Sequence, residues 1–97
     1  METMNQLRAM DIMKSLWEIV RYNKLLLDEL REDFDTRRRP CNAIRRMAKE
    51  AVGKLLAAHG RFVRIADKYG FDESYALVVR TDKLYCLAVD HCAFFEV

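Results

Sequence analysis

The chain has 97 residues, of which 52% are hydrophobic and 33% are charged, and it contains three glycines and one proline. This composition predicts one folded domain over residues 1–97 and excludes a disordered or collagen-like chain. Seventeen basic residues against fifteen acidic ones give a net charge of +2, so no overall field favours nucleic acid or an anionic membrane.

The apolar residues of the first third of the chain recur at steps of three, four and seven from Ile12 to Phe34. That spacing keeps one helical face and predicts a helix over about 4–33. Asn23 is the point at which this helix would divide if it were two. An arginine-rich segment then interrupts the period, and Pro40 predicts a turn followed by the start of a second helix.

An apolar stripe stays in phase over residues 41–69 and predicts a second long helix. Gly53 and Gly60 fall inside it, although each glycine costs about 1 kcal/mol of helix propensity relative to alanine. A helix broken at either glycine would have no reason to resume in register. Gly70, followed by Phe71, predicts a left-handed helix end with a hydrophobic contact back onto the last turn.

The last part of the chain changes to a period of two and is rich in β-branched and aromatic residues. This pattern predicts three short strands, over 74–81, 83–90 and 91–97. Two-residue turns at 82–83 and 90–91 would join them into an antiparallel meander, although neither turn carries the preferred glycine. The predicted fold class is therefore α+β, a long helical hairpin packed on a three-stranded antiparallel β-meander in the order ααβββ.

In this register, one face of the predicted sheet carries Val79 and Cys86 toward the core. The opposite face aligns three large apolar side chains: Val78, Leu87 and Phe94. A helical hairpin covers one face of a sheet, so the second face needs another cover. Because a two-fold contact buries the same patch twice, we expect a homodimer through this row. The competing interpretation is that the first helix or the N-terminal segment folds over the same face.

The first helix also carries large apolar residues away from its main stripe, and Met10, Trp17 and Leu25 resemble a protein contact surface in composition. They equally fit the flank of a wide buried stripe. With two spare apolar surfaces, the sequence favours a small non-enzymatic protein-binding module that occupies a surface of a partner protein. By analogy with orphan chains of this size, we expect a stoichiometric inhibitor of host machinery encoded by a virus or mobile element.

Charge is unevenly distributed, with ten basic against two acidic residues over 36–70. The basic positions off the apolar stripe are Arg37, Arg38, Arg39, Arg45, Arg46, Lys49, Arg61, Arg64 and Lys68. Arginine suits phosphate, so the alternative function is sequence-independent nucleic-acid binding through the basic face of the second helix. The competing interpretation is a solvated face opposite the acidic residues of the first helix.

The sequence has no catalytic, cofactor or metal motif, so we expect no enzyme, no cofactor and no bound metal. His91 lies next to Cys92, but neighbours in a strand point to opposite faces and are poorly placed to share one site. His59 fits a packed edge position on the second helix. The three cysteines are an odd number without a CxxC pair, which predicts a reducing, cytoplasmic compartment. The N-terminal residues lack the apolar stretch of a signal peptide or membrane span.

Overall fold

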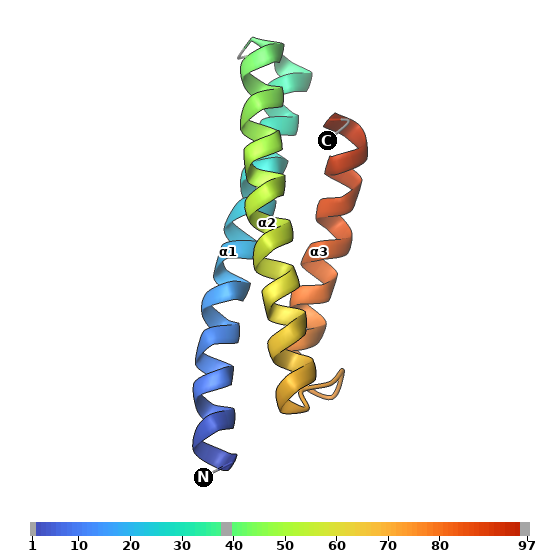
Figure 1. The fold of residues 1–97 in the computed structure, drawn as a ribbon. Helices are drawn as coiled ribbons and strands as arrows, with labels where there is room; N and C mark the ends of the chain where they lie inside the picture. Colours follow the sequence, from blue (N-terminus) through green and yellow to red (C-terminus); the bar gives the residue numbers. More distant parts are fainter. Residues whose placement is uncertain (1, 38–39, 96–97) are drawn as a thin grey trace.

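Three helices make up the fold in a computed structural model that describes residues 2–37 and 40–95, with side chains from residue 5 onward. They are α1 (Glu2–Thr36), α2 (Cys41–Tyr69) and α3 (Ala76–Phe95). Figure 1 shows α1 and α3 running in the same direction with α2 antiparallel to both. The molecule is a rod with extents of 53 × 19 × 17 Å. None of the described helices has the length and apolarity that a membrane span requires.

The prediction of a long first helix is confirmed, and its bounds differ from the expected ones by two or three residues. It does not divide at Asn23. That side chain is buried, and its amide donates a hydrogen bond of 2.8 Å to the Ile19 carbonyl one turn earlier. The buried Asn23 amide therefore has a hydrogen-bond partner within α1, and the helix continues through this residue.

The second helix is confirmed over its predicted bounds, with both internal glycines inside it. Gly70 adopts the left-handed conformation with φ of 75°, and its N–H donates to the Ala66 carbonyl. The N–H of Phe71 donates to the same carbonyl at 2.8 Å, and the Phe71 side chain is buried. The left-handed helix end is as predicted, and the Phe71 ring packs edge-on against Tyr75 with ring centroids 4.8 Å apart.

The prediction of three strands is wrong, because residues 76–95 form the single helix α3 and the described residues contain no strand. The α+β class and the ααβββ order fall with it, and the protein is all-α. The positions that α3 buries recur at helical spacing: Val78, Thr81, Ala88, His91 and Phe95. Because two of these are polar and one is alanine, the helical period is masked in the sequence. The β-branched and aromatic content then suggests strands.

The predicted sheet faces are corrected in the same way. Val79 and Cys86, expected in the core, are exposed, whereas Val78, expected on the outer face, is buried. Phe94 is partly buried against the core and Leu87 is exposed. Val78, Leu87 and Phe94 therefore do not form one row, so the sheet face through which a homodimer was predicted does not exist.

The hydrophobic core runs along the α1–α2 interface and is closed on one side by α3. Its largest fully buried side chains are Phe62, Met13, Leu27, Leu30, Ile44, Leu55, Val20 and Thr81. The Thr81 hydroxyl donates to the Leu77 carbonyl at 2.7 Å, so a buried polar group is satisfied within its own helix.

Both histidines of the chain join α3 to the other helices. Nε2 of His91 pairs with Asp28 of α1. Nε2 of His59, on α2, lies 3.4 Å from an Asp82 carboxylate oxygen, and its ring stacks on Tyr85 with centroids 3.9 Å apart. These contacts fix the register of α3 along the hairpin and so position the surfaces on either side of it.

Candidate protein-binding groove

A groove of about 310 Å³ lies between α1 and α3, and we call it the α1–α3 groove. Its lining residues are Trp17, Arg21, Arg80, Lys83, Leu84 and Leu87. The α1 pair is four residues apart, and the α3 residues follow one another at steps of three, one and three. Each set therefore occupies one side of its helix. Because both sets line the same groove, these two sides of α1 and α3 face each other.

The floor of the α1–α3 groove is apolar and its rim is cationic. Trp17, Leu84 and Leu87 supply the apolar surface, and Leu87 is 43% exposed. The guanidinium carbon of Arg21 lies 5.8 Å from the Trp17 ring centroid, within cation–π range. Arg21, Arg80 and Lys83 form no ion pair with any described residue. The groove therefore presents positive charge that the described chain does not neutralise.

Trp17 adds an unsatisfied hydrogen-bond donor to this site. Its indole Nε1 is buried, and no acceptor for it exists among the described residues. A buried donor without a partner costs about 1–3 kcal/mol. This nitrogen is not exposed in the groove, so an acceptor on an occupant would reach it only after the Trp17 side chain moves.

The structure brings two of the predicted partner-binding residues together, since Trp17 and Leu87 line the same groove. Met10 is partly buried against the core, in keeping with the interpretation of a wide buried stripe. Leu25 is exposed but does not line the groove. The remaining two predicted residues, Val78 and Phe94, pack on the core instead.

Four members of this site were not predicted: Arg21, Arg80, Lys83 and Leu84. The predicted sheet placed Leu87 in a row with Val78 and Phe94, and that row does not include Arg80. Arg80 and Leu87 are seven residues apart, and residues at this spacing share one side of a helix. A signal was present, because residues 71–97 contain no glycine or proline, which disfavours two tight hairpin turns.

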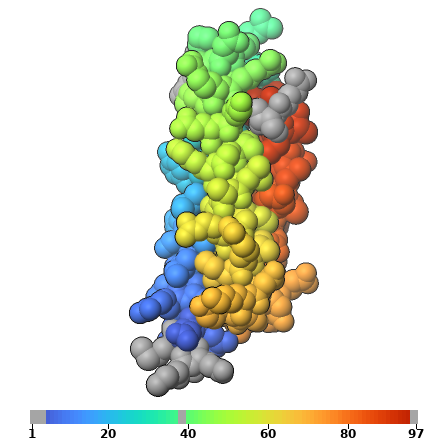
Figure 2. All heavy atoms as spheres, in the orientation of Figure 1, coloured from blue at the N-terminus to red at the C-terminus, as the bar shows by residue number. Residues whose placement is uncertain are grey.

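The predicted basic face of α2 is exposed along its length, and Figure 2 shows α2 uncovered from one end to the other in this view. Its exposed cations are Arg45, Arg46, Lys49, Arg61, Arg64 and Lys68. None of them forms an ion pair with a described residue, so the interpretation that they face the acids of α1 has no contact to support it. Arg37 is exposed at the end of α1, and Arg38 and Arg39 lie outside the described residues.

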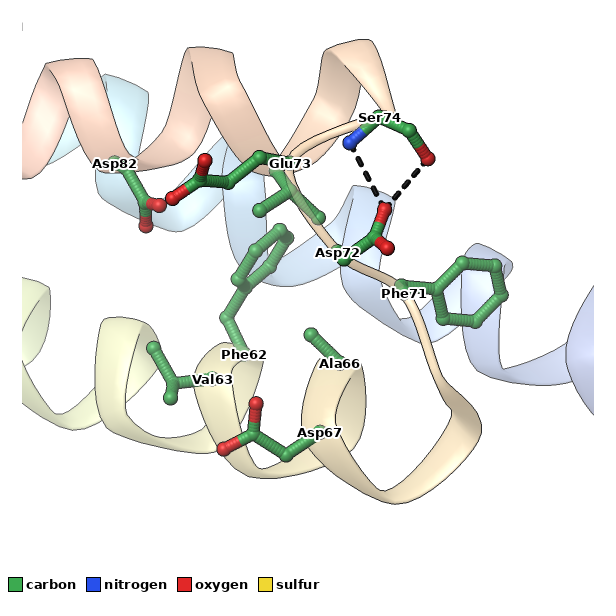
Figure 3. Close-up of a pocket in the computed structure, with 10 residues that line it drawn as sticks. Phe62, Val63, Ala66, Asp67, Phe71, Asp72, Glu73, Ser74 and Asp82 are labelled. Carbon is green, nitrogen blue, oxygen red and sulfur yellow. Dashed lines mark hydrogen bonds between the residues drawn. The ribbon is translucent and has the colours of Figure 1, made fainter.

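A second cavity, of about 490 Å³, lies between the end of α2 and the start of α3. Figure 3 shows Phe62 between the two helices, with carboxylates on the surrounding elements: Asp67, Asp72, Glu73 and Asp82. Hydrogen bonds from the Ser74 hydroxyl and backbone N–H lower the pKa of the Asp72 carboxyl. No basic residue lines this cavity. It therefore repels the negatively charged occupant that the α1–α3 groove favours.

The histidines and cysteines form no catalytic pair in the described chain. His91 pairs with Asp28 rather than with its neighbour Cys92. Burial raises the pKa of the Cys92 thiol, partly offset by a backbone hydrogen bond, which keeps the sulfur protonated near neutral pH. The described residues contain no group of three or more His, Cys, Asp or Glu side chains placed to hold a metal ion.

Comparison of the chain with protein-family models, with curated proteins and with solved structures finds no match. The function must therefore be argued from the grooves, charges and packing of the chain itself.

Proposed function

We propose that this protein is a non-enzymatic protein-binding module whose α1–α3 groove receives an acidic amphipathic helix of a partner protein. The observation that carries the proposal is the combination of an apolar floor with three cations that have no ion-pair partner in the described part of the chain. Leucine or phenylalanine side chains of the partner would lie on Trp17 and Leu87, and its carboxylates would pair with Arg21, Arg80 and Lys83.

The size of the groove suits a short helix. Residues 80–87 cover about 10 Å at 1.5 Å per residue, so about two turns of a partner helix would span the groove. Helices that dock in this way use apolar anchors spaced by three or four residues. Their flanking acidic residues would speed association and set its dependence on salt.

The cellular setting stays a prediction. Cys41, Cys86 and Cys92 are all free thiols in the structure, which supports a reducing, cytoplasmic compartment. The expectation of an inhibitor of host machinery encoded by a virus or mobile element is a prediction about the partner, and identifying that partner would test it.

The proposal is tested by selecting peptides of about 15 residues, long enough for four helical turns, from a random displayed library on the purified protein. We expect enrichment of Asp and Glu beside apolar residues at helical spacing. Binding of a selected peptide is then followed by the fluorescence of Trp17, the single tryptophan of the chain.

Two variants on α3 form a matched pair for this measurement. Leu87 and Val89 are both 43% exposed, but only Leu87 lines the α1–α3 groove. Leu87→Asp should weaken peptide binding at least tenfold by removing an anchor and repelling the carboxylates, whereas Val89→Asp should leave binding unchanged. Selected peptides without acidic residues, or equal losses in both variants, would refute the proposal.

Nucleic-acid binding is the second candidate, because the six exposed cations of the basic face of α2 have no ion-pair partner among the described residues. Contacts to phosphates would make binding insensitive to base sequence and steeply dependent on salt. Gel shifts with DNA and RNA at low ionic strength test it. Arg46→Glu and Arg64→Glu should each reduce the salt slope by about one unit if the arginine neutralises one phosphate. Absence of any shift would exclude this function.

A further inference from the structure

A second groove lies between α1 and α2, and we call it the α1–α2 groove. Its volume is about 660 Å³, which is larger than that of the α1–α3 groove. Its α1 side carries Ile19, which is 42% exposed, and Tyr22, which is 68% exposed. Its α2 side carries Ala57 and Ala58, whose small side chains let another helix approach closely. Large exposed apolar side chains opposite small ones make a surface suited to helix packing.

The α1–α2 groove carries negative charge on its α1 side and positive charge on its α2 side, so two copies of it can be complementary. Glu18 lines it from α1, and Lys54 and Arg61 line it from α2. Neither Glu18 nor Arg61 forms an ion pair with a described residue. The same asymmetry extends along both helices, since α1 has eight acidic against five basic residues and α2 has seven basic against two acidic.

A second copy of the chain satisfies this pattern in one of two symmetric arrangements. A two-fold axis parallel to the helices places α1 of each copy opposite α2 of the other, with Glu18 facing Arg61 twice. A two-fold axis across the helices instead places α1 on α1 and α2 on α2, with like charges opposed. Charge therefore selects the parallel axis, which also gives antiparallel neighbours as in a four-helix bundle.

The exposed area of the chain fits such a contact. A folded monomer of 11.5 kDa is expected to expose about 5800 Å², whereas this chain exposes 6769 Å². The extra exposed area of about 970 Å² shows that the chain has surface of the order that an interface of standard size takes from each partner, roughly 800 Å². An elongated shape accounts for the excess, and pairing along its length would remove it.

We infer that the α1–α2 groove is the interface of a homodimer whose two-fold axis runs along the helices, with Glu18 of each copy paired to Arg61 of the other. Ile19 and Tyr22 form the apolar centre of this interface against the alanines of the facing α2. This surface differs from the α1–α3 groove and shares no lining residue with it.

Sedimentation equilibrium on the purified chain tests the inference, with peptide binding to the α1–α3 groove as an independent measurement. The wild type is expected as a dimer of about 23 kDa, twice the 11.5 kDa of one chain, at about 100 µM. Ile19→Asp should raise the dimer dissociation constant at least tenfold, because the carboxylate would be buried twice. Val89→Asp, of similar exposure on α3, should leave the constant unchanged.

Charge reversal identifies the axis. Glu18→Arg and Arg61→Glu should each weaken the dimer at least tenfold, because each change opposes like charges at two places, and the double variant should restore dimerisation. Circular dichroism would show that each variant keeps its helices. A monomeric wild type, or a double variant as weak as either single one, would overturn the inference. So would a dimer that Val89→Asp disrupts and Ile19→Asp does not.

Discussion

Gly53 and Gly60 allow a sharp test of the continuous second helix. Both lie at least nine residues inside α2, and a Cβ built on either would meet no atom within 4 Å. Neither has a positive φ, so alanine fits the same backbone without strain. Because alanine exceeds glycine by about 1 kcal/mol in helix propensity, Gly53→Ala and Gly60→Ala should each raise the free energy of unfolding by that amount.

The effect is large enough for a thermal melt. At about 2.1 cal/mol/K for each residue, the 97 residues give an unfolding entropy of about 0.2 kcal/mol/K. Each alanine should therefore raise the melting temperature by about 5 °C, and the double variant by about 10 °C if the two sites are additive. A decrease, or no change in either variant, would mean that α2 is not continuous or that something packs against these glycines.

Three further outcomes follow from named contacts. Asp28→Asn should reduce the loss of unfolding free energy that the wild type shows at acid pH. Burial raises the pKa of Asp28, but hydrogen bonds from Lys24 and His91 outweigh this effect and lower the pKa overall. That stability is present above about pH 4 and is lost as the pH falls through the folded pKa, so urea unfolding at pH 6 and pH 3 should separate the variant from wild type mainly at pH 6. With iodoacetamide at pH 8, Cys86 should react before Cys92, because Cys86 is exposed and burial raises the Cys92 pKa; equal rates would contradict this. Phe62→Ala should cost about 3–5 kcal/mol by urea unfolding, since it empties a fully buried site, and a loss under 1 kcal/mol would place Phe62 outside the core.

The two long helices could be predicted because their apolar residues carry the period and their ends carry local signals. In α2 the core positions are mostly alanine, leucine, isoleucine and phenylalanine, so the stripe is visible through both glycines. Gly70 marks its end through a backbone conformation that favours glycine. In α1 the single buried amide, Asn23, bonds within its own turn and so leaves the helix intact.

The third helix could not be predicted from periodicity, because two of its inward positions are polar. Thr81 is buried because its hydroxyl bonds to the backbone of its own helix. His91 is buried because Asp28, 63 residues away, meets it on α1. No residue near His91 in the sequence indicates that Asp28 is its partner. The strand interpretation ended its first strand at Thr81 and placed His91 in a turn, and therefore missed the helical stripe that these residues complete.

The α1–α3 groove could not be predicted for the same reason, because most of its lining residues lie on α3. Trp17 was expected in a binding surface as a large apolar residue off the main stripe of the first helix, and Leu87 was expected there as part of a sheet face that does not exist. That they face each other follows from the parallel course of α1 and α3, which the His91–Asp28 contact fixes in register. The cations of the rim come from both helices, so their convergence depends on tertiary structure rather than on any run of basic residues.

The two proposed surfaces have different physical requirements, and the fold keeps them apart. The α1–α2 groove carries both signs of charge, from Glu18 and Arg61, and therefore suits a copy of itself. The α1–α3 groove carries one sign, from Arg21, Arg80 and Lys83, and repels its own copy while attracting an acidic partner. Since the grooves share no residue, a dimer formed through the first leaves the second open on each copy. Each dimer would then present two partner sites, and a partner with two acidic helices would bind it more tightly than one helix alone.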